Sequence, residues 1–361
     1  MKKIVLSFLV LLVSAGALFA QSDLQFLAVV KQSKSESVTV KQLKARCETY
    51  EKQIGKKLTV DERKQVLEAL IEEKLVLQAA AKAGISIPDS SVNQYFLQSM
   101  SAQVGANVTE KELNDLIMKS QGKTLEQLLL EQTGMTVAEY KAYLKNQLIA
   151  QQYVVSQKQS ELSKVAASDD QIRQFYESNK ASFVWTDMMK MFLVIVPKNG
   201  NPEAAKTKCN ELRNKIVDKK LTLDQIEVQA KYENSGYQAG TLLIQKTEPY
   251  AMNLGMEYSN LLVLFTRDKG FISYLQERDV DYRIVTVMQK YDAKLLSISD
   301  IVQPESTVTV YDYIRSTLTQ QLQMQALQQA AQDISNALNT SENVERKKTG
   351  DALTKLLDWG N

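Results

Sequence analysis

The side chains that do most chemistry in proteins are scarce in this chain, whose 361 residues include two cysteines and no histidine. The lack of histidine excludes a Ser-His-Asp or Cys-His pair, a His-built zinc site, imidazole-held haem and an imidazole proton shuttle. Carboxylate, Lys or Tyr acid–base chemistry remains open. Acidic pairs such as Asp169/Asp170 and Asp279/Asp281 are more typical of a helix start and a surface loop. We therefore predict no metal site and no cofactor.

The first 22 residues, MKKIVLSFLVLLVSAGALFAQS, have the three-part layout of a secretory signal. Two lysines precede an apolar run, which is too short for a stable transmembrane span, and small residues follow up to Ala20. We expect cleavage near Ala20, with Ala17 as the alternative, giving a periplasmic or otherwise exported protein without a membrane span. A signal retained as an anchor is the other possibility.

The net charge of the chain bears on which classes of molecule it can bind. The chain has 44 Lys and Arg against 42 Asp and Glu, and removal of residues 1–20 takes away two lysines and no acid, leaving a neutral protein. A neutral exported chain predicts no nucleic-acid partner. No GxxxxGK[ST] loop is present, so we also predict no nucleotide. Export permits disulfides, but Cys47 lies on an apolar helical stripe far in sequence from Cys209, which favours two buried thiols over a bridge.

The residues up to 182 predict a hairpin followed by helices. Two β-type runs, 26–30 and 38–40, flank a polar turn. A Ser or Thr followed three positions later by Glu or Gln then begins one apolar stripe after another, as in a helix capping box. The five boxes are Thr59/Glu62, Thr109/Glu112, Thr124/Gln127, Thr136/Glu139 and Ser168/Gln171. Their repetition predicts a helical domain.

Aromatic and soft side chains occupy the apolar stripes of these helices. One interpretation makes them the core of a helix bundle; the other makes some of them an exposed groove for unfolded chains, since such side chains repack around varied partners. The candidates for this second role are Tyr95, Phe96, Met100, Tyr140, Tyr143 and Leu144.

From Met188 onward the pattern changes. A dense apolar run that ends in PKNGNP predicts a buried strand, two helices follow, and AGTLLIQ and VDYRIVTVMQKYD predict further strands. This order indicates a small α/β domain with an antiparallel sheet. After Pro304 a single long helix is expected, and ALTKLLDWGN near the C-terminus can dock through its leucines and tryptophan.

The order of parts resembles the exported SurA/PrsA-type chaperones that carry a parvulin peptidyl-prolyl isomerase domain. The stretches that carry this resemblance are the hairpin AVVKQSKSESVTVKQL, the helix VLEALIEEKLVLQAAAKAGISIPDSSV and the lead-in SDDQIRQFYESNKASF. The long helix after residue 305 matches that family's return to complete its N-terminal chaperone module. The resemblance spans nearly the whole mature chain.

In the isomerase-like region the order of elements resembles that of the family, but the family's catalytic residues are not matched. The two family histidines fall at Phe192 or Leu193 and at Arg283, and the family acid falls at Thr241. Tyr258 and Phe265 preserve part of an apolar framework. The resemblance therefore implies a vestigial pocket with no catalytic residue.

We therefore expect a predominantly helical α+β protein, in which a SurA-like helical module contains an inserted parvulin-like domain. The expected parts are a signal peptide 1–20, the N-terminal helical module 21–186, the degenerate parvulin-like domain 187–292 and a C-terminal segment 293–361 that completes the module. The resemblance implies an ATP-independent holdase for unfolded exported or outer-membrane polypeptides. The alternatives are an active isomerase with an altered pocket and an envelope scaffold that binds one folded partner; the oligomeric state stays open.

Overall fold

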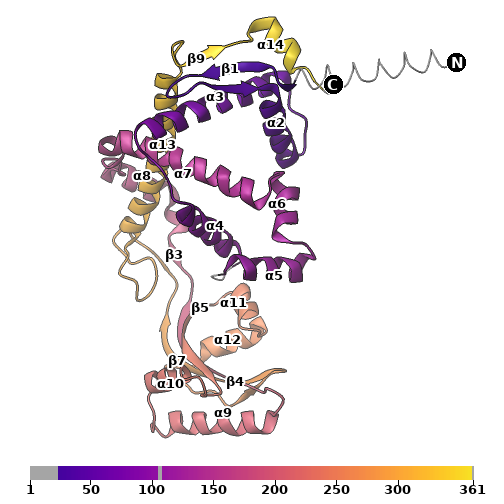
Figure 1. Cartoon of the computed structure of the whole chain (residues 1–361). Helices are drawn as coiled ribbons and strands as arrows, with labels where there is room; N and C mark the ends of the chain where they lie inside the picture. The colour runs from indigo at the N-terminus through magenta and orange to yellow at the C-terminus, as the bar shows by residue number, and fades with distance from the viewer. Residues whose placement is uncertain (1–22, 105–107, 360–361) are drawn as a thin grey trace, which may run out of the picture. The chain divides into compact units, whose positions relative to one another are not determined.

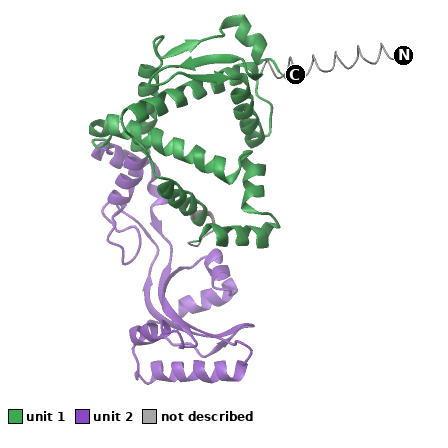
Figure 2. Ribbon diagram, viewed as in Figure 1, with its two compact units in different colours: residues 1–165, 321–361 green, residues 166–320 purple. Residues whose placement is uncertain are grey.

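The computed structural model describes residues 23–104 and 108–359, so the predicted signal peptide and its cleavage site lie outside the described residues. The chain divides into two compact units (Figure 2). Unit 1 contains residues up to 165 and residues 321–361, and unit 2 contains residues 166–320. Among the described residues, no helix combines the length and apolar character needed to cross a membrane.

Unit 1 begins with a small sheet to which both ends of the chain contribute (Figure 1). Strand β1 (Phe26–Val30) pairs antiparallel with β2 (Glu36–Thr39) on one side and with β9 (Val344–Arg346) on the other. Helices α2 (Val40–Ile54), α3 (Val60–Lys82) and the C-terminal α14 (Gly350–Leu357) supply apolar side chains to the core at this sheet. The predicted hairpin and the docking of the C-terminal leucines and tryptophan are confirmed.

The other helices of unit 1 follow one another through short connections. They are α4 (Asp89–Val104), α5 (Glu110–Gln121), α6 (Leu125–Thr133) and α7 (Val137–Leu162). All five predicted capping boxes are present, the fifth at Ser168 in unit 2. In each, the Thr or Ser hydroxyl accepts a bond from the third backbone N–H of the helix, and the Glu or Gln side chain accepts one from the backbone N–H of the cap residue. Boxes at Thr39 and Thr222 were not predicted.

Unit 2 holds a four-stranded antiparallel sheet in the order β5-β4-β7-β6. Its strands are β4 (Met188–Pro197), β5 (Gln238–Gln245), β6 (Gln276–Glu277) and β7 (Asp281–Tyr291). One face packs with α9 (Pro202–Val217) and α10 (Leu223–Ala230), and the other with α11 (Glu248–Asn253) and α12 (Tyr258–Thr266). The aliphatic segment 259–265 lies in α12, although an apolar run of this length fits a strand as well.

The remaining elements of unit 2 form a smaller core. They are α8 (Asp169–Asn179), the 3-10 turn η1 (Lys180–Ser182) and the paired strands β3 (Val184–Trp185) and β8 (Lys294–Leu295). The first turns of the long helix α13 (Val310–Leu338) pack into the same core, and the helix continues into unit 1. The predicted fold class is thereby confirmed. The domain boundaries at 186 and 292 stay predictions, since the compact units divide at 165 and 320.

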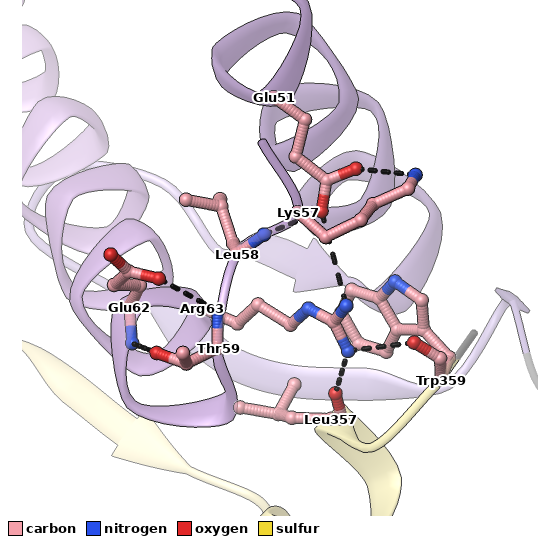
Figure 3. Close-up of polar contacts among 8 residues, drawn as sticks. All are labelled: Glu51, Lys57, Leu58, Thr59, Glu62, Arg63, Leu357 and Trp359. Carbon is pink, nitrogen blue, oxygen red and sulfur yellow. Dashed lines mark hydrogen bonds and ion pairs between the residues drawn. The ribbon is translucent and has the colours of Figure 1, made fainter. Parts of the chain in front are cut away.

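Unit 1 also holds a buried charge. The Arg63 side chain on α3 is 1% exposed, and its Nη1 donates to the carbonyl oxygens of Leu357 and Trp359 at 2.7 Å each (Figure 3). Its guanidinium lies over the Trp359 ring at 4.7 Å, and Glu51 Oε1 lies 3.9 Å from Nη2. Because the carbonyls at the end of a helix have no partners within it, Arg63 caps α14 and fastens the C-terminal segment to α3.

Both cysteines are free and buried, as favoured from the sequence. Burial raises the pKa of the Cys47 thiol to about 11 and that of the Cys209 thiol to about 12. Both groups therefore stay protonated near neutral pH and are poor nucleophiles.

Candidate functional site

Two hollows of unit 1 lie beside α7. One has a volume of about 540 Å³ and is lined by α2, α3, α7 and the C-terminal half of α13. That volume is in the range of ligand-binding pockets, about 300 to 1,000 Å³. Its apolar lining consists of three alanines and three larger aliphatic residues: Ala69, Ala150, Ala331, Val76, Val154 and Leu327. We call this hollow the α7/α13 groove.

A second hollow of about 540 Å³ adjoins the α7/α13 groove, between α2, α3 and the start of α7. The two share Arg46, Glu73, Tyr143 and Asn146 as lining residues. Arg46 Nη2 donates to Glu73 Oε2 at 2.9 Å. Burial alone lowers the pKa of the Arg46 guanidinium, but the facing Glu73 carboxylate outweighs it and the pKa is raised. The shared wall thus holds an ion pair in which the Arg46 guanidinium keeps its charge.

The α7/α13 groove also has a polar lining that carries no charge. It comprises five primary amides, from Asn146, Gln147, Gln151, Gln328 and Gln332. The hydroxyl groups of Tyr50, Tyr143 and Ser335 add to them. Each amide offers both a donor and an acceptor, so the groove combines small apolar patches with many neutral hydrogen-bonding groups.

The six side chains predicted to contact unfolded chains do not form one surface. Phe96 is fully buried and Leu144 is 7% exposed, both in the core shared by α4 to α7, and Met100 and Tyr140 pack against that core. For these four the helix-core interpretation holds, and Phe96 and Leu144 are not accessible to a client. The reason is that α5 and α6 cover the stripe, which the sequence of α4 alone cannot reveal.

The other two candidates differ from that group. Tyr95 is 47% exposed and lines neither hollow of unit 1, whereas Tyr143 lines both. The groove residues contributed by α13 were missed, because a glutamine-rich stretch is typical of an exposed helix face; Gln328 and Gln332 are exposed where they line the hollow.

In unit 2, the six predicted pocket residues lie on both faces of the sheet. Phe192 is buried on the α9 face, and Thr241 is its partner on β5. Leu193 is buried on the α11/α12 face, where Phe265 packs against the same core. Tyr258 is 36% exposed, and its hydroxyl donates to the Lys246 carbonyl. Phe192 and Thr241 therefore cannot contribute to a pocket on the face that holds Leu193.

Arg283 lies on the α11/α12 face, opposite Ile195 on β4. Its Nε and Nη2 donate to the two carboxylate oxygens of Asp281 at 2.8 and 3.0 Å, and its Nη1 donates to the Leu254 carbonyl at 2.6 Å. The guanidinium is thus engaged in a bidentate ion pair that ties β7 to the α11/α12 connection. This arrangement gives Arg283 a structural role.

A hollow of about 420 Å³ lies beside α12 in unit 2. Its lining includes Met256, Val263, Leu264, Arg267, Phe271 and Tyr274, and none of the six predicted pocket residues is part of it.

Comparison with known proteins bears mainly on the N-terminal part. A family sequence profile described as the SurA-like N-terminal domain matches residues 2–154. Residues 2–154 thus resemble a SurA-like N-terminal domain. The foldase protein PrsA of Clostridium acetobutylicum is 29% identical over 147 residues, which are 40% of this chain and 39% of the relative. The foldase PrsA of Clostridium botulinum is 26% identical over 140 residues. The chain thus spans about two fifths of the length of the curated relatives that it matches.

Solved structures give a weaker likeness over more of the chain. One solved structure comes from work on two SurA-like chaperones of Campylobacter jejuni, the virulence factor PEB4 and the periplasmic protein Cj1289. It is 16% identical to this chain, covers 90% of this chain and 99% of its own, and has a TM-score of 0.35. PrsA from Bacillus subtilis is 14% identical over 92% of this chain and 98% of its own, with a TM-score of 0.27. Both TM-scores are low, so the assignment rests on the SurA-like domain. The SurA/PrsA resemblance is confirmed there, and the degenerate parvulin domain stays a prediction.

Proposed function

We propose that this protein is an ATP-independent chaperone that holds unfolded exported polypeptides, outer-membrane proteins among them. The observation that carries the proposal is the α7/α13 groove, which lies largely within the SurA-like part of the chain and combines apolar side chains with many uncharged amides and hydroxyls. Such a lining suits weak, reversible contacts with many sequences. Export to the periplasm after cleavage near Ala20 belongs to the same proposal.

The experiment is an aggregation assay with a denatured outer-membrane protein and the purified mature chain. We expect equimolar chaperone to slow light scattering. Ala150→Trp, which places a large ring in the groove, should weaken the effect, whereas Gln152→Trp on the same helix lies outside the groove lining and should preserve it. If the wild-type chain leaves aggregation unchanged, the chaperone proposal fails.

We further propose that the sheet domain of unit 2 binds without catalysing prolyl isomerisation. That reaction has a barrier of about 20 kcal/mol and needs a polar network around the twisted amide. Leu193 and the ion-paired Arg283 supply no such network at the two family histidine positions. An active isomerase with an altered pocket is the alternative, and a clear acceleration of cis/trans exchange in a proline tetrapeptide would establish it. Crosslinking in cells that captures one dominant folded partner would instead favour the scaffold.

A further inference from the structure

The outer edge of strand β5 in unit 2 has no partner strand. β5 lies at one end of the sheet order β5-β4-β7-β6 and pairs with β4 along its whole length, from Gln238 to Gln245. Apart from this pairing, residues 238–244 form no backbone hydrogen bond within the described part of the chain. Every second residue of an edge strand directs its N–H and C=O groups away from the sheet. A row of main-chain donors and acceptors is therefore left for a further strand.

The β5 edge lacks the features that keep sheet edges from pairing. Short strands, charged side chains, prolines and bulges are the usual protection. The sequence of β5, QAGTLLIQ, contains no charged residue and no proline, and its pairing with β4 has no bulge. The opposite edge strand of this sheet, β6, has only two residues, and the outer strands of the unit 1 sheet, β2 and β9, carry Glu36 and Glu345. Among the edge strands that the structure describes, β5 alone is both long and uncharged.

The side chains of β5 complement those of a second, antiparallel copy of β5. A two-fold axis perpendicular to the sheet keeps each face of the sheet continuous, so residues directly opposite one another must belong to the same face. An axis at Thr241 meets this condition, since it places Thr241 opposite its own copy. Gly240 then lies opposite Leu242 on the α11/α12 face, and Ala239 lies opposite Leu243 on the α9 face. A small residue thus meets a large one on both faces.

Charge and exposure are compatible with this pairing. Like charges directly opposite one another destabilise a strand pair. Lys246, the first charged residue after β5, would lie opposite Gly236 of the second copy, so no charge meets another along the paired strands. Thr241 and Leu242 at the centre of the edge are both exposed. The space beside Gly240 is open as well, because a Cβ built there would have no atom within 4 Å outside the adjacent residues.

We propose that this protein forms a symmetric dimer in which the β5 edges of two copies pair antiparallel about Thr241. The two four-stranded sheets thereby become one continuous sheet. Main-chain hydrogen bonds supply affinity, as in other cases of strand addition to a sheet edge, and the matching of small and large side chains sets the register. The contact uses unit 2 and does not rest on the proposed chaperone function.

Cysteine crosslinking tests the register. In Thr241→Cys the two introduced thiols face each other, and directly opposite Cα atoms of antiparallel strands lie about 4.5 to 5.5 Å apart, within reach of a disulfide. We expect this variant of the full mature chain to form a covalent dimer under mild oxidation. Thr207→Cys, at an exposed position of α9, is the matched control and should stay monomeric. The natural cysteines are buried and do not compete. No covalent dimer of Thr241→Cys, or equal crosslinking of both variants, would overturn the inference.

Charge substitution tests the dimer without a covalent bond. Sedimentation equilibrium of the wild-type chain should show dimers at about 100 μM protein. Thr241→Lys and Thr241→Glu should each weaken dimerisation about tenfold or more, because like charges then meet at the axis. An equimolar mixture of these two variants should associate again, since opposite charges meet in the mixed dimer. Thr207→Lys adds the same charge on the exposed face of α9 and should dimerise like the wild type.

Two results would contradict the dimer. One is a mixture of the two charged variants that associates no better than either variant alone. The other is a wild-type chain that stays monomeric throughout; if Thr241→Lys then weakened its hold on a denatured polypeptide in the aggregation assay, the edge would belong to a client strand instead of a second copy. A dimer that forms while the wild-type chain leaves aggregation unchanged would keep this inference and remove only the chaperone proposal.

Discussion

At the scale of single residues, Arg63 stands out in unit 1 because its charged side chain is almost completely buried. Its guanidinium is removed from water and interacts with two carbonyl oxygens, an aromatic ring and a carboxylate. Charge-assisted hydrogen bonds of this kind are strong, and their removal leaves buried acceptors without donors. Arg63 thus connects the first helices of the chain to its last one.

Arg63→Met should lower the free energy of unfolding of unit 1 by about 3 kcal/mol, because the carbonyls of Leu357 and Trp359 lose their donor. Urea denaturation followed by circular dichroism measures this. Lys64→Met is the control, since Lys64 is the next residue on α3 and its side chain is 37% exposed. Similar losses in the two variants would contradict the anchoring role of Arg63.

The cysteines give a second prediction at this scale. Because burial holds Cys47 and Cys209 as thiols, neither should react with a thiol reagent such as DTNB at pH 8 in the folded chain. Both should react once urea unfolds it. A chain that stays unreactive in urea without reductant would instead contain a bridge.

At the scale of elements, the capping boxes set where most helices of unit 1 begin. Thr136→Ala should lower the free energy of unfolding by about 1 kcal/mol, because the N-terminus of α7 loses its side-chain acceptor. Thr349→Ala provides the comparison, since Thr349 precedes α14 without a side-chain cap bond. The difference between the two values isolates the capping bond, and equal values would contradict it.

Local elements were predictable because their signals are local. A capping box, a run of alternating residues or a glycine after a helix acts within a few positions, and the hairpin, the helices and the faces of β7 follow from such patterns. Tyr282 and Ile284 face one core and Val285 and Val287 the other, as expected from their alternation. For segment 259–265 the sequence does not distinguish helix from strand, because an apolar run of this length fits either type of element.

The groove was not predictable for the opposite reason. Ser335 and Gln332 belong to a glutamine-rich helix whose own sequence indicates exposure. They line a hollow only because α7, nearly two hundred residues earlier in the chain, lies opposite them. The burial of Phe96 was not predictable for a similar reason, because the helices that cover it follow it in the sequence.

At the scale of the whole molecule, the lack of histidine determines how stability varies with pH. Hydrogen bonds from the Thr59 backbone and Lys56 lower the pKa of Glu62 to about 2, and bonds from Lys31 and Lys347 lower that of Glu345 to about 2. These carboxylates stabilise the fold fully above their unfolded pKa, and the contribution disappears as pH falls toward 2. The buried thiols act in the opposite range, since their raised pKa values favour the fold until pH rises above about 9.

We therefore expect a nearly constant melting temperature between about pH 5 and 8, the range in which histidine titrates in most proteins. The melting temperature should decline below about pH 4.5, because carboxylates whose pKa is lowered in the folded chain take up protons more readily in the unfolded chain. Scanning calorimetry across this range tests the prediction. High salt should reduce this fall in melting temperature at acid pH, because the ion pairs of Glu62 and Glu345 are exposed to solvent and are therefore screened. A transition near pH 6.5 would contradict this account.

The small sheet shared by the two ends of the chain sets the timing of assembly. Strand β9 and helix α14 follow the whole of unit 2 in the sequence, so β1 lacks one neighbour and Arg63 lacks its carbonyl partners until the last residues arrive. A chain that emerges from its N-terminus first therefore carries an open apolar core until β9 and α14 have been synthesised. Closing a loop of that length is slow compared with forming local helices. For that interval a nascent copy is an incompletely folded polypeptide with exposed apolar side chains.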